Sequence, residues 1–268
     1  MNFEIKTELK NIVLNTNNLK DTYIKKHTNT KHTLDKIIDE LLYFLKSGVS
    51  WKNLRSTINY KTLHWHFTKF VKYNIFLKLF NKIKNMYLKK YSHNNTSLFI
   101  DSTSINNKYG VNKIGRNKFY KNKKVTKISL MTDTYDFPLS IFFMKGNYHD
   151  NSVFEKHIKD AVILMPKNIK TVVADKAYTS LNNYKLLESK NIKHIIPPRQ
   201  NMKLYKTYTY DKTEYKKRIK VEHIFGRLKI FRRFNFRYDK YLRNFSAFTY
   251  LAFSMISLNI LKKRCSIN

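Results

Sequence analysis

The chain has 268 residues, 42% of them hydrophobic and 15% aromatic, which is enough apolar material for one large globular domain or two smaller ones. A formal charge of +35, from 53 Lys and Arg against 18 Asp and Glu, predicts a polyanionic partner, first nucleic acid and second an acidic membrane. The single cysteine, Cys265, excludes an internal disulfide and fits a reducing compartment, and no Cys/His spacing indicates a zinc site.

The arginines are more informative than the lysines. An A/T-rich genome can raise the lysine content without selection for binding, and only 10 of the 53 basic residues are Arg. Six of these ten nevertheless fall within one stretch of 26 residues. They are Arg218, Arg227, Arg232, Arg233, Arg237 and Arg243. We expect this stretch to contact nucleic acid.

The N-terminal third predicts helices. Residues 1–30 are polar and weakly periodic, so we expect them to be loosely ordered or only partly helical. From Thr33, which can cap a helix, apolar residues follow at helical spacing until Gly48, a typical helix end. Further helices are predicted to begin at Ser50, after Asn59 and at Ile75.

Short helices joined by tight turns resemble a helix-turn-helix module, whose third helix enters the major groove of DNA. The candidate contacts are Arg55, Lys61, His64, Lys69 and Lys72. A plain helical bundle with solvated lysines explains the same pattern equally well, so both interpretations stay open.

From Ser97 the pattern changes to strands alternating with helices. A meander of three strands followed by helix, strand, helix and strand predicts a ribonuclease-H-like fold, a mixed α/β sheet flanked by helices. The expected strands are 98–101, 125–132, 137–145, 169–174 and 192–196, and the expected helices are 152–164 and 181–189. We therefore divide the chain into a helical DNA-binding domain, 1–95, and a catalytic domain, 96–268.

One uncharged stretch, 244–261, is borderline in length for a membrane span. Several Ser, Thr and Asn residues interrupt it, and basic residues flank both ends. We expect a buried packing helix and no membrane.

Two of the predicted strands end in an aspartate, Asp101 and Asp175. Neighbouring strand ends can lie side by side, and two carboxylates that share a pocket need a proton or a cation between them; hard cations such as Mg²⁺ take oxygen ligands of this kind. Taken singly, each aspartate also fits a helix cap or turn. The pair makes a metal site and a structural role about equally plausible.

A third acid, Glu222, falls in a predicted helix. Tyr215, Arg218, Glu222 and Lys229 lie at offsets that place them on one helical stripe, with an apolar stripe beside them. Gly226 lies on the polar stripe, where a missing side chain would let a DNA backbone approach closely. A surface helix with an Arg218–Glu222 ion pair is the alternative.

The spacing Tyr215-(2)-Arg218-(3)-Glu222-(6)-Lys229 is similar to a signature of insertion-sequence transposases with a DDE motif. The chain resembles the insertion sequence 5 group of the 4/5 superfamily over roughly residues 33–261. Supporting stretches are Asp101-Ser-Thr, Gly146-Asn-Tyr-His-Asp150, Ala174-Asp-Lys-Ala-Tyr178 and Ile196-Pro-Pro-Arg199. Ala177 departs from the pattern, which usually has glycine there.

The resemblance implies a DNA transposase that binds the terminal inverted repeats of its mobile element, cuts DNA and joins strands. Asp101, Asp175 and Glu222 would be the catalytic residues and would bind two Mg²⁺ ions, for which Mn²⁺ can substitute. The chain would bind double-stranded DNA, both the element ends and the target. It would act on this DNA as a homodimer, inside the cell. The expected DNA contacts are Tyr215, Arg218, Lys229, Arg227, Arg232, Arg233 and Lys176.

Other acids and a histidine have less specific interpretations. Asp150 is either a helix cap, which we favour, or a fourth ligand, while Asp133 and Asp136 fit a hairpin and His223 a structural role. Three other functions stay open: a domesticated DNA-binding protein without activity, a nuclease that never joins strands, and a basic protein of the membrane surface.

Overall fold

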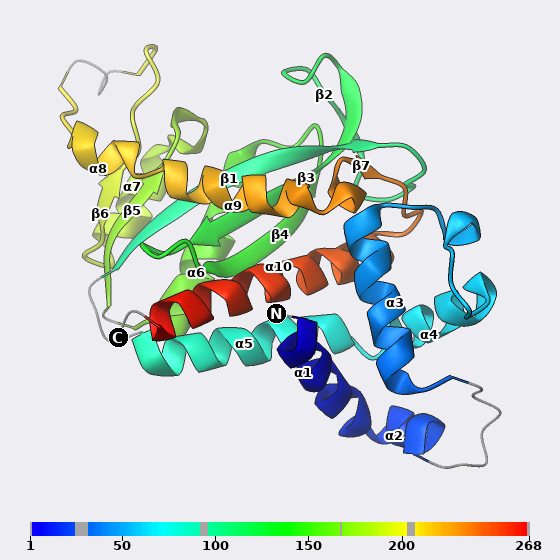
Figure 1. Cartoon of the computed structure of the whole chain (residues 1–268). Coiled ribbons are helices and arrows are strands. Elements are labelled where there is room, and N and C mark those ends of the chain that lie inside the picture. Colours follow the sequence, from blue (N-terminus) through cyan, green and yellow to red (C-terminus); the bar gives the residue numbers. More distant parts are fainter. Residues whose placement is uncertain (1, 25–31, 92–95, 167, 203–206, 267–268) are drawn as a thin grey trace. The chain divides into compact units, whose positions relative to one another are not determined.

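The computed structural model describes residues 2–24, 32–91, 96–166, 168–202 and 207–266, which pack as two compact units (Figure 1). The first comprises Met1–Asn85, Lys108–Asn112 and Arg227–Asn268, and the second comprises Met86–Asn107 and Lys113–Gly226. Units of packing and domains of function need not coincide, so the division into 1–95 and 96–268 stays a prediction.

The first unit is helical. Its helices are α1 Asn2–Leu14, α2 Asn17–Ile24, α3 Leu34–Ser47, η1 Trp51–Asn53, α4 Tyr60–Lys72, α5 Ile75–Tyr91 up to Asn85, the end of α9 Ile219–Ile230, η5 Arg232–Phe234 and α10 Leu242–Cys265, and it also holds the short strand β7 Phe236–Arg237. Residues 2–24 are more helical than the expected loose or partly helical order, because Ile5, Leu9 and Val13 recur at helical spacing and are buried. The rest of that prediction, residues 25–30, lies outside the described residues.

The caps that the sequence predicts define α3 and α4. The Thr33 side chain accepts a hydrogen bond from the backbone N–H of Lys36, and Asn59 accepts one from Lys61. Gly48 ends α3 in the left-handed region, at φ 68°. A side chain there would also bring a Cβ within 2.9 Å of the Cβ of Arg232, so both conformation and packing require glycine.

Aromatic rings form the core of the first unit. Phe44 of α3 stacks on Trp51 at a centroid distance of 3.9 Å, and Phe67 of α4 stacks on Phe248 of α10 at 4.3 Å. The guanidinium of Arg233 lies over both Phe44 and Phe248, at 4.2 and 4.4 Å from their ring centroids. One buried cation therefore joins helices from both ends of the chain.

Helix α10 contains the uncharged stretch 244–261. It is the one described helix that is long and apolar enough to cross a membrane, and 78% of its most apolar window is buried inside the protein. That burial is typical of a core helix, as expected from the sequence.

The second unit is built on a mixed sheet. Its strands are β1 Thr96–Asn107, β2 Gly115–Asn117, β3 Lys123–Thr132, β4 Pro138–Lys145, β5 Ile169–Ala174 and β6 Lys193–Ile195. The strands pair in the order β2-β3-β1-β5-β6, with β4 also paired to β3. β3 runs antiparallel to β1, β2 and β4, whereas β5 runs parallel to both β1 and β6. This sheet confirms the predicted ribonuclease-H-like fold class.

Helices of the second unit cover its sheet. They are η2 Asp150–Val153, α6 Phe154–Leu164, η3 Lys176–Tyr178, α7 Leu181–Glu188 and α8 Lys212–Lys216, with the first turns of α9 and the last of α5. α6 packs on β4 and α7 on β6, and the two helices contact each other (Figure 1). The last three residues of β5, Val172–Ala174, are fully buried.

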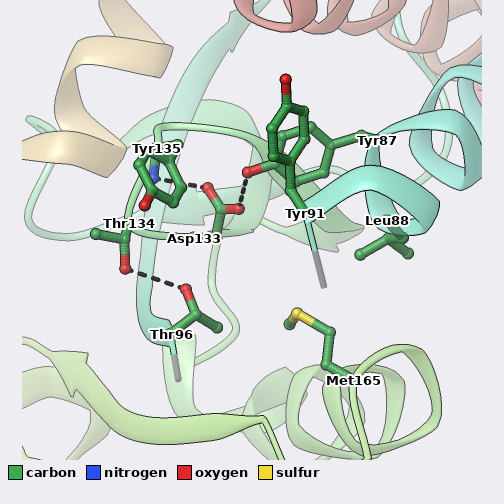
Figure 2. A pocket seen from close by; sticks show the side chains of 8 residues that line it. All are labelled: Tyr87, Leu88, Tyr91, Thr96, Asp133, Thr134, Tyr135 and Met165. Carbon is green, nitrogen blue, oxygen red and sulfur yellow. Dashed lines mark hydrogen bonds between the residues drawn. The ribbon is translucent and has the colours of Figure 1, made fainter. Parts of the chain in front are cut away.

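A small cavity of about 40 Å³ lies beside the β3–β4 hairpin (Figure 2). The Asp133 carboxylate in its wall is fully hydrogen-bonded. It accepts hydrogen bonds from the Tyr87 hydroxyl and from the backbone N–H of Tyr135 and of Phe137. Figure 2 shows the bonds from Tyr87 and Tyr135 to the Asp133 carboxylate. The cavity is far smaller than ligand sites, and Asp133 is a hairpin residue as predicted.

Candidate active site

Asp101 lies on β1, and Asp175 directly follows the neighbouring parallel strand β5. The register pairs Ile100 of β1 with Ala174 of β5, so each aspartate directly follows one member of the same pair. The sequence predicted that this strand ends at Asp101. Instead, β1 continues to Asn107 because it keeps pairing with β3. The Asp175 side chain accepts a hydrogen bond of 2.6 Å from the N–H of Ala177 and caps η3.

The segment of Tyr215, Arg218 and Glu222 is a broken helix. Tyr215 lies on α8, Glu222 lies on α9, and Arg218 lies between them. At the break the N–H of Arg218 bonds to the carbonyl of Tyr215, and that of Val221 to the carbonyl of Arg218. These i to i+3 bonds are tighter than α-helical ones, so the continuous stripe predicted from Tyr215 to Lys229 was wrong.

The apolar face of α9 agrees with the sequence. Val221, Ile224 and Leu228 are fully buried, whereas Glu222, His223 and Gly226 are exposed. A Cβ added at Gly226 would meet nothing within 4 Å, so no packing inside the chain requires glycine there.

Arg218 joins two of the three acids. Its Nη1 donates to Asp101 Oδ2 at 2.6 Å and its Nη2 donates to Glu222 Oε1 at 2.5 Å. The side chain of Asp101 is 19% exposed and that of Glu222 is 47% exposed. A guanidinium therefore occupies the position of a shared cation between the two carboxylates.

Electrostatics couple these groups further. Burial raises the pKa of Asp101 to about 6; the Arg218 charge and the N–H of Ser102 oppose the rise, and the negative charges of Asp175 and Glu222 add to it. For Arg218, burial lowers the pKa, but the charges of Asp101 and Glu222 outweigh it and raise the pKa above its ordinary value. The acids and the arginine thus form one anionic site that attracts cations.

The sequence analysis missed a polar group behind β1. Lys127 of β3 is buried, and its Nζ donates to Asp150 Oδ1 and to the Tyr148 carbonyl, both at 2.9 Å. The Ser102 hydroxyl donates to the same Asp150 oxygen at 2.6 Å. Asp150 therefore ties β1, next to Asp101, to β3, and its side chain does not cap η2. The sequence signal was that Lys127 is the one charged residue of the expected strand 125–132.

A second brace holds the loop after Asp175. Arg199 donates through Nε to the carbonyl of Lys176 and through Nη2 to that of Ala177, each at 3.2 Å. The Lys176 side chain is exposed. Arg199 belonged to one of the motif stretches, but the pattern alone gave it no role.

The arginine-rich stretch divides by burial. Arg232 and Lys229 are exposed and Arg227 is half-buried, all three within the first unit. Arg233 is 6% exposed and pairs with Asp239 at 2.8 Å, and Arg237 is fully buried. The expected DNA contact of Arg233 is corrected: its guanidinium is used by the core, where it meets two rings and a carboxylate.

The site fits a divalent cation by donor chemistry. Among the described residues, no three Asp, Glu, His or Cys side chains converge closely enough to form a complete metal site. Carboxylate oxygens are nevertheless the ligands that hard cations prefer, and the site already binds one cation of its own, Arg218.

Comparison with known proteins identifies the family. Residues 93–258, more than half of the chain, match the family model of the transposase DDE domain, a family that generally uses divalent metal ions. Comparison with curated proteins gives no match. Among solved structures, the chain is similar to the cryo-EM structure of a piggyBac transposase synaptic complex with hairpin DNA, at 15% identity and a TM-score of 0.41. The similarity covers 75% of this chain and 49% of the other, so the chain spans about half the length of that transposase. The match to the family model confirms the resemblance at the level of the DDE domain: the chain belongs to the transposase DDE-domain family.

Proposed function

We propose that the protein is a DNA transposase that cuts DNA at the ends of its mobile element and joins them to a target. The observation that carries the proposal is the site of Asp101, Asp175 and Glu222, in which one arginine bridges two acids from distant parts of the chain. We further propose that the chain belongs to the insertion sequence 5 group, binds double-stranded DNA as a homodimer, and works inside the cell on DNA.

The three carboxylates would hold divalent ions, with Mg²⁺ as the proposed metal and Mn²⁺ as a substitute. Bound ions of this kind activate water or a 3′-hydroxyl and stabilise the leaving oxygen of an in-line displacement at phosphorus. The carboxylate of Asp101 must be ionised to act as a ligand. Its pKa of about 6 means that it is largely deprotonated at neutral pH.

Arg218 can bind either carboxylates or a phosphate. Its planar fork binds carboxylates in the structure and would bind a DNA phosphate equally well. With divalent ions on Asp101 and Glu222, the guanidinium would no longer be needed to neutralise them and would be free to hold the phosphate next to the scissile bond. Tyr215, half-buried beside Arg218, and the exposed Lys176 are proposed DNA contacts of the same site.

Further contacts are proposed outside the acids. Lys229, Arg227 and Arg232 would bind phosphates, and the helical region 1–95 would bind the terminal repeats in the manner of a helix-turn-helix module. Such phosphate contacts make affinity fall steeply with salt. A flat salt dependence would therefore contradict DNA as the partner.

The test is a cleavage assay on a plasmid that carries the gene with its flanking DNA. We expect nicking that depends on Mg²⁺ and falls to background in Asp101→Ala. Glu155→Gln is the matched control, because Glu155 is an exposed acid of α6 that pairs only with its neighbour Lys159. Unchanged nicking in Asp101→Ala would disprove the assignment. Joining of a pre-cut end to a second DNA separates a transposase from a nuclease that only hydrolyses.

A further inference from the structure

A cavity of about 440 Å³ lies in the first unit, between the end of α4, the start of α5 and the first turns of α10. Its volume is within the range of small-molecule sites in proteins. The floor is apolar and buried. It consists of Phe70, Val71, Phe76 and Ala247.

The mouth of the cavity is polar and cationic. The exposed lining residues are Thr68, Lys72, Asn74 and Arg243. No acidic residue lines the cavity. Within the described part of the chain, no carboxylate pairs with Lys72 or Arg243, whose charged groups lie over the rings of Tyr73 and Tyr241 at 5.6 and 5.1 Å. The mouth therefore favours an anion.

The wall contributed by α10 carries both cationic and apolar residues. Arg243, Ser246, Ala247 and Tyr250 recur at helical spacing, so one stripe of the helix runs from the mouth to the floor. Ser246 and Tyr250 are half-buried, intermediate between the exposed Arg243 and the buried Ala247. An occupant meets a cation first, then a hydroxyl group, then an apolar surface.

We propose that this cavity binds one unpaired nucleotide of a DNA strand, with its phosphate between Lys72 and Arg243 and its base on the buried apolar floor. A nucleotide has this combination of groups: an anion, a base edge that exchanges hydrogen bonds, and a flat apolar face. The amide of Asn74 can exchange hydrogen bonds with the base edge, and the Ser246 hydroxyl, which donates to the carbonyl of Arg243, can accept one. Stacking and apolar contact with a base make such a site tolerant of sequence.

This inference rests on DNA as the partner in the proposed function, but it concerns a site without acids. The probe is a duplex that carries a single unpaired 2-aminopurine nucleotide, whose fluorescence falls when the base stacks, in buffer without divalent metal. We expect the protein to quench it and to bind this duplex about tenfold more tightly than the fully paired duplex. Equal affinity for both duplexes, without quenching, would overturn the proposal.

Two kinds of variant test the location. Ala247→Phe fills the floor, and Ser246→Phe fills the half-buried wall should the first variant fail to fold; each is expected to remove the quenching and the tenfold preference. Lys72→Gln with Arg243→Gln should also abolish the preference. Its control, Lys20→Gln with Lys263→Gln, removes the same charge from exposed lysines outside the cavity and should keep the preference. Quenching that persists in a folded Ala247→Phe or Ser246→Phe variant contradicts the proposal.

A last arm distinguishes the source of the nucleotide. The 5′-monophosphate of 2-aminopurine deoxyribonucleoside should bind at least tenfold more weakly than the duplex, because it lacks the neighbouring phosphates. Equal binding would make this a site for free nucleotides and overturn the strand-bound version. Asp101→Ala should quench normally, so failure of the catalytic assignment and failure of the cavity assignment give different results.

Discussion

Arg218 and Arg233 come from the same arginine-rich stretch and each pairs with an aspartate, yet their surroundings are opposite. The side chain of Arg218 is 23% exposed and bridges two acids, whereas that of Arg233 is 5% exposed and lies on two phenyl rings. A cation that water can reach can exchange its partner for a metal or a phosphate. A cation enclosed by rings cannot, and its contribution is to stability.

The largest effect is expected from Arg233→Gln. Loss of the guanidinium leaves Asp239 buried without its cation and opens a gap between Phe44 and Phe248, so the free energy of unfolding should fall by about 3–5 kcal/mol. Denaturant unfolding measures it. The exposed neighbour provides the control: Arg232→Gln should change stability by less than about 0.5 kcal/mol. Similar losses in both variants would contradict the contrast between buried and exposed arginines.

The next effect concerns a buried base of the second unit. Burial lowers the pKa of His157 to about 3 from its ordinary 6.5, and its ring nitrogens bond to the hydroxyls of Ser129 and Ser140. Between these pH values only the unfolded chain binds the proton. The stability contribution is therefore complete above pH 6.5 and is lost as the pH falls toward 3, by about 1.4 kcal/mol per pH unit. The free energy of unfolding, measured as a function of pH, should show this slope. If a His157→Gln variant keeps the full slope, the slope does not come from His157.

A smaller effect is expected from Arg218→Gln. Its ion pairs are partly exposed, so the metal-free protein should lose only about 1 kcal/mol of stability. Because the guanidinium competes for the same oxygens, the variant should bind Mn²⁺ about fivefold more tightly while losing cleavage. Calorimetric titration with Mn²⁺ gives the affinity. Weaker Mn²⁺ binding in the variant would mean that Arg218 positions the acids and does not compete for them.

The smallest effect is expected from Gly226→Ala. Alanine stabilises an exposed helix position by about 0.5–1 kcal/mol relative to glycine, and no atom of the chain opposes the new methyl group. If a DNA backbone approaches this face of α9, the same methyl group weakens DNA binding. Thermal unfolding and a DNA titration measure the two effects separately. A gain in stability with unchanged DNA affinity would remove Gly226 from the proposed interface.

The fold was predictable where periodicity and turns agree. Strand 169–174 and the capped helix after Thr33 follow from local pattern alone, whereas the pairing of β1 with β5 was only one possible arrangement until the fold was known. The strand β2 was missed because three residues carry no periodicity. Helix α1 was missed because its polar residues conceal an apolar stripe of one residue per turn.

The sequence proposes the residues of the candidate site but does not give its geometry. Helical offsets placed Arg218 beside Glu222, but its second bond, to Asp101, joins residues 117 positions apart and leaves no local pattern. The burial of Arg233 was hidden for the same reason, since Phe44 and Phe248 come from opposite ends of the chain. Pairs at long separation in sequence cannot be deduced from a single sequence without the fold.

The interleaving of the two units has a consequence for synthesis of the protein. The second unit is drawn almost entirely from Met86–Gly226, whereas the first needs both the N-terminal helices and α10. On a ribosome the sheet of the second unit can form before α10 has been made. At that stage α3 and α4 of the first unit still lack their apolar partner. The ring surfaces of Phe44 and Phe67 that contact Phe248 therefore stay uncovered until α10 has been synthesised.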